Sequence, residues 1–245
     1  MGRSPPTALD QYDPGSSVLV VSPSMDASEI VTTVEGIRSP DPTGETDDER
    51  PTVVVSRDHT AEAILNAWRS RIGDFPSQFS IVSIGEVTRS VAASSSSMEL
   101  PQAHILTVGT EDVTGIGIAI GDALSRWDES EGEAEDGDEV KAGGEGGYSN
   151  SKSNSKSNSK SNSNSSSNPN SNSNSNQHPI LWFESLTPLL ERKGLEMTFR
   201  FLHVTLEEIR RADAVAYVHV DSSVQDRETI TTLSHLFDDV VELES

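Results

Sequence analysis

The turn at residues 22–29 (SPSMDASE) is the first place where side chains capable of chemistry follow a short β-branched run. In open α/β sheets the first strand-to-helix turn is the usual phosphate cradle, and a P-loop there requires G-x-x-x-x-G-K-[ST]. This turn has neither glycine nor lysine, and Asp26 and Glu29 stand where a phosphate would bind. Gly-Lys occurs nowhere in the chain. The sequence therefore argues against a nucleotide site of the P-loop kind.

Glu184 and Ser185 form the second candidate, because they directly follow the apolar run at residues 179–183 (PILWF). A carboxylate at the end of a parallel strand can hold Mg²⁺ when a nucleotide phosphate lies beside it. The alternative is a carboxylate that is exposed to solvent or capped by neighbouring donors. Since the sequence offers no phosphate cradle, we expect this alternative and expect no cofactor.

His203, His219 and Asp221 are of the residue types that bind metals. His219 and Asp221 alternate along one expected strand, whereas His203 lies on a separate expected helix. No local spacing therefore brings three ligands together. We expect no metal site, and histidines that are satisfied within the fold or lie at the surface.

Gly115, Gly117 and Gly121 form a glycine run of the kind found in some dinucleotide sites. The run lies within a segment of helical period and does not directly follow a strand, so close helix packing is the simpler explanation. The chain also lacks the G-x-S-x-G motif that exposes a nucleophilic serine. We therefore predict no catalytic residue.

The chain is strongly acidic, with 40 Asp and Glu against 18 Lys and Arg and a formal net charge of −22. This charge disfavours binding to nucleic acids and anionic membranes. The absence of cysteine excludes disulfides and thiol catalysis. No apolar run is long enough to span a bilayer, and the N-terminal residues lack the apolar region of a secretory signal. We expect a cytoplasmic protein.

Residues 128–177 divide the chain, because an acidic run there passes into a Ser/Asn repeat without any apolar face. Such a segment buries nothing that could offset the entropy of ordering, so we expect a disordered insertion. Residues 1–127 and 178–245 should form two parts of one domain. Outside the insertion Lys193 is the only lysine. An acidic, lysine-poor surface indicates a halophile with a salt-rich cytoplasm.

Short β-branched runs alternate with segments of helical period on both sides of the insertion. Helices are expected to begin near Asp26 and Thr60, where capping residues precede apolar stripes. This alternation predicts an α/β fold of three layers, with a mainly parallel sheet flanked by helices. The expected strands are residues 18–22, 51–56, 79–84, 103–108, 179–183, 214–220 and 240–243.

The segment PILWFESLTPLL, residues 179–190, resembles the Walker B strand and following turn of RecA-type and KaiC-type ATPases. In that family an Asp helps to hold magnesium, and Glu184 stands at its position. The ADAV stretch at residues 212–215 is similar to the family's entry into a late strand. With DVTGIGIAI at residues 112–120, these segments also resemble uncharacterised proteins of halophilic archaea that look like degenerate members of this superfamily. The resemblance implies a RecA-like P-loop NTPase core, with Glu184 and Ser185 at a vestigial cofactor-binding position.

The resemblance, combined with the missing P-loop lysine, implies a non-catalytic regulatory or protein-binding module. Its partner would be another protein or a second copy of the chain, in contact with the edges of the sheet. The alternative is an atypical ATPase or nucleotide-binding protein without Walker A. It would use Arg57, Arg200 or Arg210 in place of the lysine and Glu184 to hold magnesium.

Overall fold

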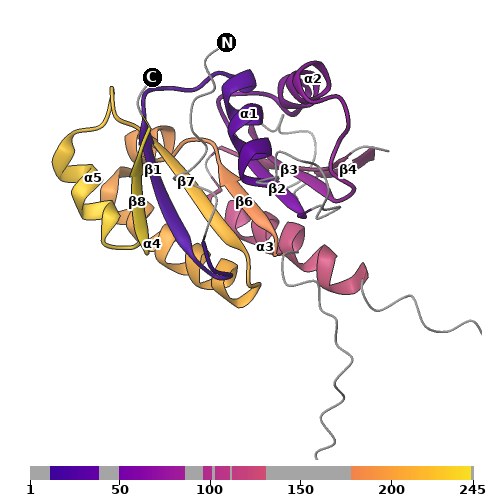
Figure 1. Ribbon diagram of the computed structural model, residues 1–245. Helices are drawn as coiled ribbons and strands as arrows, with labels where there is room; N and C mark the ends of the chain where they lie inside the picture. Colours follow the sequence, from indigo (N-terminus) through magenta and orange to yellow (C-terminus); the bar gives the residue numbers. More distant parts are fainter. Residues whose placement is uncertain are drawn as a thin grey trace, which may run out of the picture.

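The structure, a computed structural model, describes residues 12–38, 50–85, 96–100, 103–110, 112–130 and 178–243, in which strands and helices alternate (Figure 1). The strands are β1 (Ser17–Ser22), β2 (Thr52–Ser56), β3 (Phe79–Gly85), β4 (Ser96–Leu100), β5 (Ala103–Gly109), β6 (Ile180–Phe183), β7 (Val215–Asp221) and β8 (Asp239–Glu242). The helices are α1 (Ala27–Arg38), α2 (Ala61–Arg71), α3 (Val113–Ser130), α4 (Thr187–Arg211) and α5 (Arg227–Ser234).

The described strands form one sheet in the order β4-β5-β3-β2-β6-β7-β1-β8. Neighbours are parallel throughout, except that β4 runs antiparallel to β5 at one edge. Strands from before and after residues 128–177 are interleaved, because β6 and β7 lie between β2 and β1. The two parts of the chain thus complete a single sheet.

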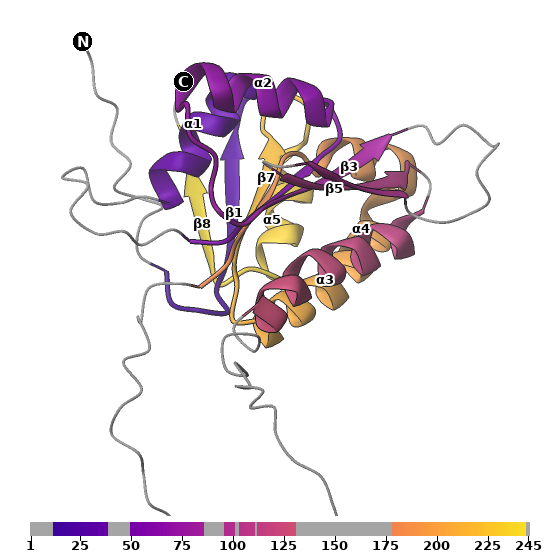
Figure 2. The ribbon, with the colours of Figure 1, turned by 90° about the vertical axis from the view of Figure 1, so that its right-hand side faces the viewer.

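Helices cover both faces of this sheet, which gives the predicted three-layer α/β architecture (Figure 2). Successive strand residues point to opposite faces, so Val18 and Val20 pack with α1 and α2, whereas Leu19 and Val21 pack with α3, α4 and α5. Every residue of β1, β2, β6 and β7 is buried. Burial on both faces explains why these strands are continuous apolar runs instead of alternating ones.

One element differs from the sequence prediction, which missed β4: its sequence SSMEL contains no β-branched residue and therefore gives no strand signal. Non-helical backbone at Gly194 divides α4 into two helical segments. Gly194 has a φ of +75°, a conformation that side chains other than glycine rarely adopt.

The predicted disordered insertion lies outside the described residues, apart from residues 128–130 at the end of α3. Among the helices that the structure describes, none has the length and apolar character required to cross a bilayer.

Candidate functional site

Among the residues that the structure describes, the carboxyl ends of β1, β2, β6 and β7 carry most of the buried polar side chains. They are Ser22, Ser56, Glu184, Ser185, Thr187, His219 and Asp221. Ligands of open α/β sheets usually bind at this edge. These strand ends, called the carboxyl edge below, are therefore the candidate functional site. What it can bind depends on whether these polar groups are available to a ligand or already bonded to each other.

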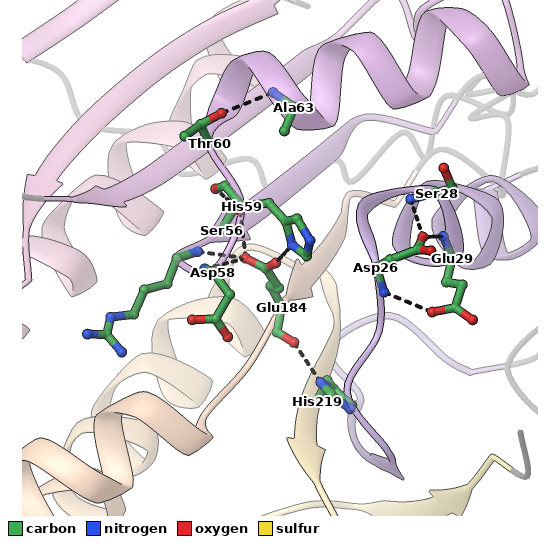
Figure 3. A network of polar contacts seen from close by, with 11 residues as sticks. Asp26, Ser28, Glu29, Ser56, Asp58, His59, Thr60, Ala63, Glu184 and His219 are labelled. Atoms are coloured by element: carbon green, nitrogen blue, oxygen red, sulfur yellow. Dashed lines mark hydrogen bonds and ion pairs between the residues drawn. The ribbon is translucent and has the colours of Figure 1, made fainter.

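The turn between β1 and α1 is closed by its own carboxylates (Figure 3). Asp26 accepts hydrogen bonds from the backbone N–H groups of Ser28 and Glu29 at 2.7 and 2.9 Å. Glu29 in return accepts the N–H of Asp26 at 2.8 Å. This capping box confirms the predicted start of the helix. It also consumes the N–H groups that a phosphate would need and adds two negative charges there.

Glu184 is 3% exposed and binds the turn that follows β2 (Figure 3). Its Oε2 accepts the hydroxyl of Ser56 at 2.6 Å and the backbone N–H groups of Arg57 and Asp58 at 2.6 and 3.1 Å. Its Oε1 pairs with Nδ1 of His59. Glu184 is therefore a carboxylate capped by neighbouring donors, which was the alternative to a magnesium ligand. Both of its oxygens bond to groups of the protein.

Asp58 lies beside this network on the same turn. Burial raises the pKa of its carboxyl above the ordinary value, and the Glu184 carboxylate raises it further. Arg57 and His59 act in the opposite direction on the same group. The edge of the sheet thus concentrates negative charge, which opposes the approach of a nucleotide phosphate.

His219 is buried and joins three adjacent strands. Its Nδ1 donates to the backbone carbonyl of Glu184 at 2.7 Å, and its Nε2 lies 3.0 Å from the hydroxyl of Ser22. The backbone N–H of Asp221 donates to Thr187 Oγ1 at 3.2 Å, a second bond between β7 and the segment after β6. These bonds tie together the ends of β1, β7 and β6.

The expected absence of a metal cluster concerned His203, His219 and Asp221. His203 is exposed on α4, whereas His219 and Asp221 are buried on β7, and Asp221 accepts the N–H and hydroxyl of Ser223. The structure thus does not bring these three residues together as ligands. In the part of the chain that the structure describes, no group of three or more His, Asp and Glu residues could hold a metal ion.

The arginines of the alternative hypothesis are not gathered at one place. Arg210 pairs with Asp238 at 3.6 Å. Asp238 accepts the backbone N–H of Ser17 at the start of β1, so Arg210 lies near the amino ends of the strands, away from the carboxyl ends. Arg200 pairs with Glu196 on the exposed side of α4. Arg57 alone belongs to the carboxyl edge.

Arg57 borders a small, mostly apolar hollow that has room for about one water molecule. Ser185 also lines it, so the second residue of the predicted vestigial position faces this hollow and not the Glu184 network. The other lining residues are Ile84, Thr110, Ile116, Phe183, Pro188 and Leu189.

The glycine run lies on α3, as its helical period predicted. A Cβ at Gly117 would lie 3.9 Å from Phe201 and Thr205 of α4, an ordinary contact distance, so close packing of the helices does not require glycine there. It does not explain the other two glycines either. A Cβ at Gly115 would meet Asp112, the residue that precedes α3, and one at Gly121 would have no neighbour within 4 Å.

Sequence reasoning missed the role of Ser56 and His59. The available signal was the polar sequence SRDHT at residues 56–60, directly after a buried strand. Its partner Glu184 is 125 positions from His59. Only the adjacency of β2 and β6 brings the two together.

The fold and the site define a class: a three-layer α/β protein in which the polar side chains at the strand ends bond to one another. The chain belongs to a family of unknown function (DUF7504), whose model matches residues 15–139 and 171–243. No curated protein matches the chain.

Proposed function

We propose that this protein is a non-catalytic, RecA/KaiC-like module of a halophilic archaeon that acts in the cytoplasm by binding proteins. In this proposal its nucleotide site has been lost and the core is retained for regulation. The scarcity of lysine outside residues 128–177 supports the halophilic origin. The order of buried parallel strands and covering helices is compatible with the proposed core.

The bonding of Glu184 carries the proposal. A magnesium ligand at the end of β6 needs a carboxylate lone pair that the ion can reach, whereas Glu184 is buried and both its oxygens already bond to the turn after β2. Binding of Mg²⁺ would break these bonds in a site where only 3% of the residue is exposed. Losing hydrogen bonds to a buried carboxylate costs about 1–3 kcal/mol or more. The closed capping box at Asp26 and Glu29 removes the matching phosphate site.

A second candidate function is retained because of Arg57. This arginine borders the hollow at the carboxyl edge, where it could supply the positive charge that the P-loop lysine gives in related ATPases. The corresponding activity is atypical nucleotide binding without Walker A. The hollow is small and mostly apolar, and the adjacent Asp58 and Glu184 are acidic, so we favour the non-catalytic function.

Thermal unfolding with and without magnesium-ATP distinguishes the two functions. The full chain is measured in about 2–3 M KCl, because an acidic surface of this kind needs screening. A ligand that binds only the folded state adds about 2.7 kcal/mol of stability at a hundred times its dissociation constant. We expect no change in the unfolding midpoint.

An upward shift would overturn the proposal and support nucleotide binding. In that case Arg57→Ala should abolish the shift, because Arg57 lies at the hollow. Arg200→Ala is the matched control, since Arg200 is exposed and paired with Glu196 away from the carboxyl edge.

A further inference from the structure

The outer surface of α3 and α4 exposes large apolar side chains. Among the described residues, five large hydrophobic side chains are exposed, and three of them lie on these two helices: Ile118 at 58%, Met197 at 46% and Val204 at 62%. We define these three residues as the α3–α4 patch. Scattered exposed apolar residues are ordinary in proteins, but a contiguous group marks an interaction site.

α3 and α4 pack side by side, so the outer surfaces of the two helices adjoin (Figure 2). The helices meet near Gly117, whose Cβ position lies 3.9 Å from side-chain atoms of Phe201 and Thr205. Ile118 directly follows Gly117. Met197 and Val204 lie one turn on either side of Phe201, on the α3 side of α4. All three side chains are exposed, so the α3–α4 patch lies on the adjoining outer surfaces of the two helices.

The charge of these two helices differs from that of the chain as a whole. α3 and α4 together contain seven acidic and six basic residues, a net charge of −1 in a chain of −22. Residues 226–242, which include α5 and β8, contain five acidic residues and one basic residue. Two copies can meet on α3 and α4 without the repulsion between carboxylates that opposes contact at β8. α1 and α2 are also balanced, but they expose no large hydrophobic side chain in the described residues.

The rim of the patch carries both signs of charge. Glu196 and Arg200 flank Met197 on α4, with side chains that are 82% and 71% exposed. A two-fold axis brings the same patch of each copy together, so the arginine of one copy can face the glutamate of the other. A rim that contains both charges beside an apolar centre is complementary to itself.

We infer that the α3–α4 patch is the contact surface of a homodimer. The inference deepens the proposed function, on which it rests, by naming a second copy of the chain as the partner, and it moves the contact from the sheet edges to a helix layer. α3 has 18 residues and is about 27 Å long. Two helices of this length present on the order of 500 Å², below the roughly 800 Å² per partner of a stable complex. The dimer is therefore weak and reversible.

Sedimentation equilibrium of the full chain without nucleotide tests the inference in molar KCl, over two decades of protein concentration. The mass of the wild-type protein should rise from one copy towards two. Ile118→Glu and Val204→Glu should each raise the dissociation constant by more than about tenfold, because the new carboxylate loses its water on contact. Both positions are exposed, so the variants should keep the wild-type unfolding midpoint.

Val224→Glu is the matched control, because Val224 is 55% exposed but lies in the turn between β7 and α5. It should dimerise as the wild type does. A wild-type mass of one copy at every concentration, a mass beyond two copies, or equal loss of association in the control would each overturn the inference. The outcome is independent of the magnesium-ATP measurement, so failure of the dimer and failure of the proposed function are distinguishable.

Discussion

Nδ1 of His219 lies 2.7 Å from the backbone carbonyl oxygen of Glu184, although the two residues are 35 positions apart. A carbonyl oxygen only accepts, so this nitrogen carries the proton. The other ring nitrogen lies beside Ser22 at the end of β1. One buried ring thus connects both strands next to its own, across the place where ligands of α/β proteins enter. Substitutions can break these few polar bonds at the strand ends.

Glu184→Gln should lower the free energy of unfolding by about 3 kcal/mol. The amide keeps the shape of the side chain, but it has one accepting oxygen and places an NH₂ group against the donors of the turn after β2. Breaking a buried, hydrogen-bonded charge network typically costs this much. Denaturant unfolding at neutral pH measures the change.

Glu196→Gln makes the same chemical change at a side chain that is 82% exposed. Its effect should stay within about 0.5 kcal/mol, because exposed ion pairs contribute little. Equal effects of the two substitutions would show that Glu184 does not hold the turn.

His219→Ala should lower the free energy of unfolding by about 3 kcal/mol. The substitution leaves a cavity and removes the partner of the Glu184 carbonyl, which remains buried. His203→Ala, at an exposed position of α4, is the control and should have little effect. A stability loss at His203 as large as that at His219 would contradict the role of the buried ring. Both changes are read from denaturant unfolding curves.

The sequence predicted those features that depend on neighbouring residues. The buried strands β1, β2 and β7 follow from continuous apolar runs, and the starts of α1 and α2 follow from Asp26 and Thr60, whose side chains cap the expected helices. Such local signals need no knowledge of strand order.

The pairing of His59 with Glu184 could not be predicted in the same way. It depends on β2 lying next to β6 in the register that places Val55 beside Phe183. Nothing local in either segment specifies that adjacency. The sequence therefore identified Glu184 as a candidate site residue from its place at a strand end. The partners of its carboxylate could be identified only once the order of the strands in the sheet was known.

Gly121→Ala should raise the free energy of unfolding by about 0.5–1 kcal/mol, because alanine is the better helix former and nothing lies within 4 Å of the new Cβ. Gly115→Ala should instead be neutral or destabilising. Its Cβ would lie 2.4 Å from Oδ2 of Asp112, whose other oxygen accepts the Gly115 N–H at 2.7 Å. Loss of such a cap costs about 1 kcal/mol, which offsets the helix propensity.

Thermal unfolding of both alanine variants at low protein concentration checks this prediction without interference from self-association. Stabilisation by Gly115→Ala equal to that by Gly121→Ala would mean that Asp112 does not constrain the start of α3.

Asp58→Asn should stabilise the protein at neutral pH. Burial and the Glu184 carboxylate raise the pKa of Asp58 above the ordinary 3.8, so the folded state binds this proton more tightly than the unfolded state. The free energy of unfolding therefore falls as the pH rises from 3.8 through the higher native pKa, and the penalty persists at neutral pH. The neutral amide avoids it. The advantage of the variant should vanish below pH 3.8, where the wild-type carboxyl is protonated in both states.

Asp226→Asn provides a control of opposite sign. Hydrogen bonds from Thr229 lower the pKa of the exposed Asp226 carboxyl, so its charge stabilises the fold above the ordinary 3.8 and that contribution is lost as the pH falls. The variant should be less stable than the wild type at neutral pH and should approach it in acid. Unfolding midpoints measured across this pH range should thus diverge in opposite directions for the two variants. If the two variants instead change in stability in the same direction, burial of Asp58 is not the cause of its effect. The loss of one carboxylate from an acidic chain, which both substitutions share, would then explain both curves.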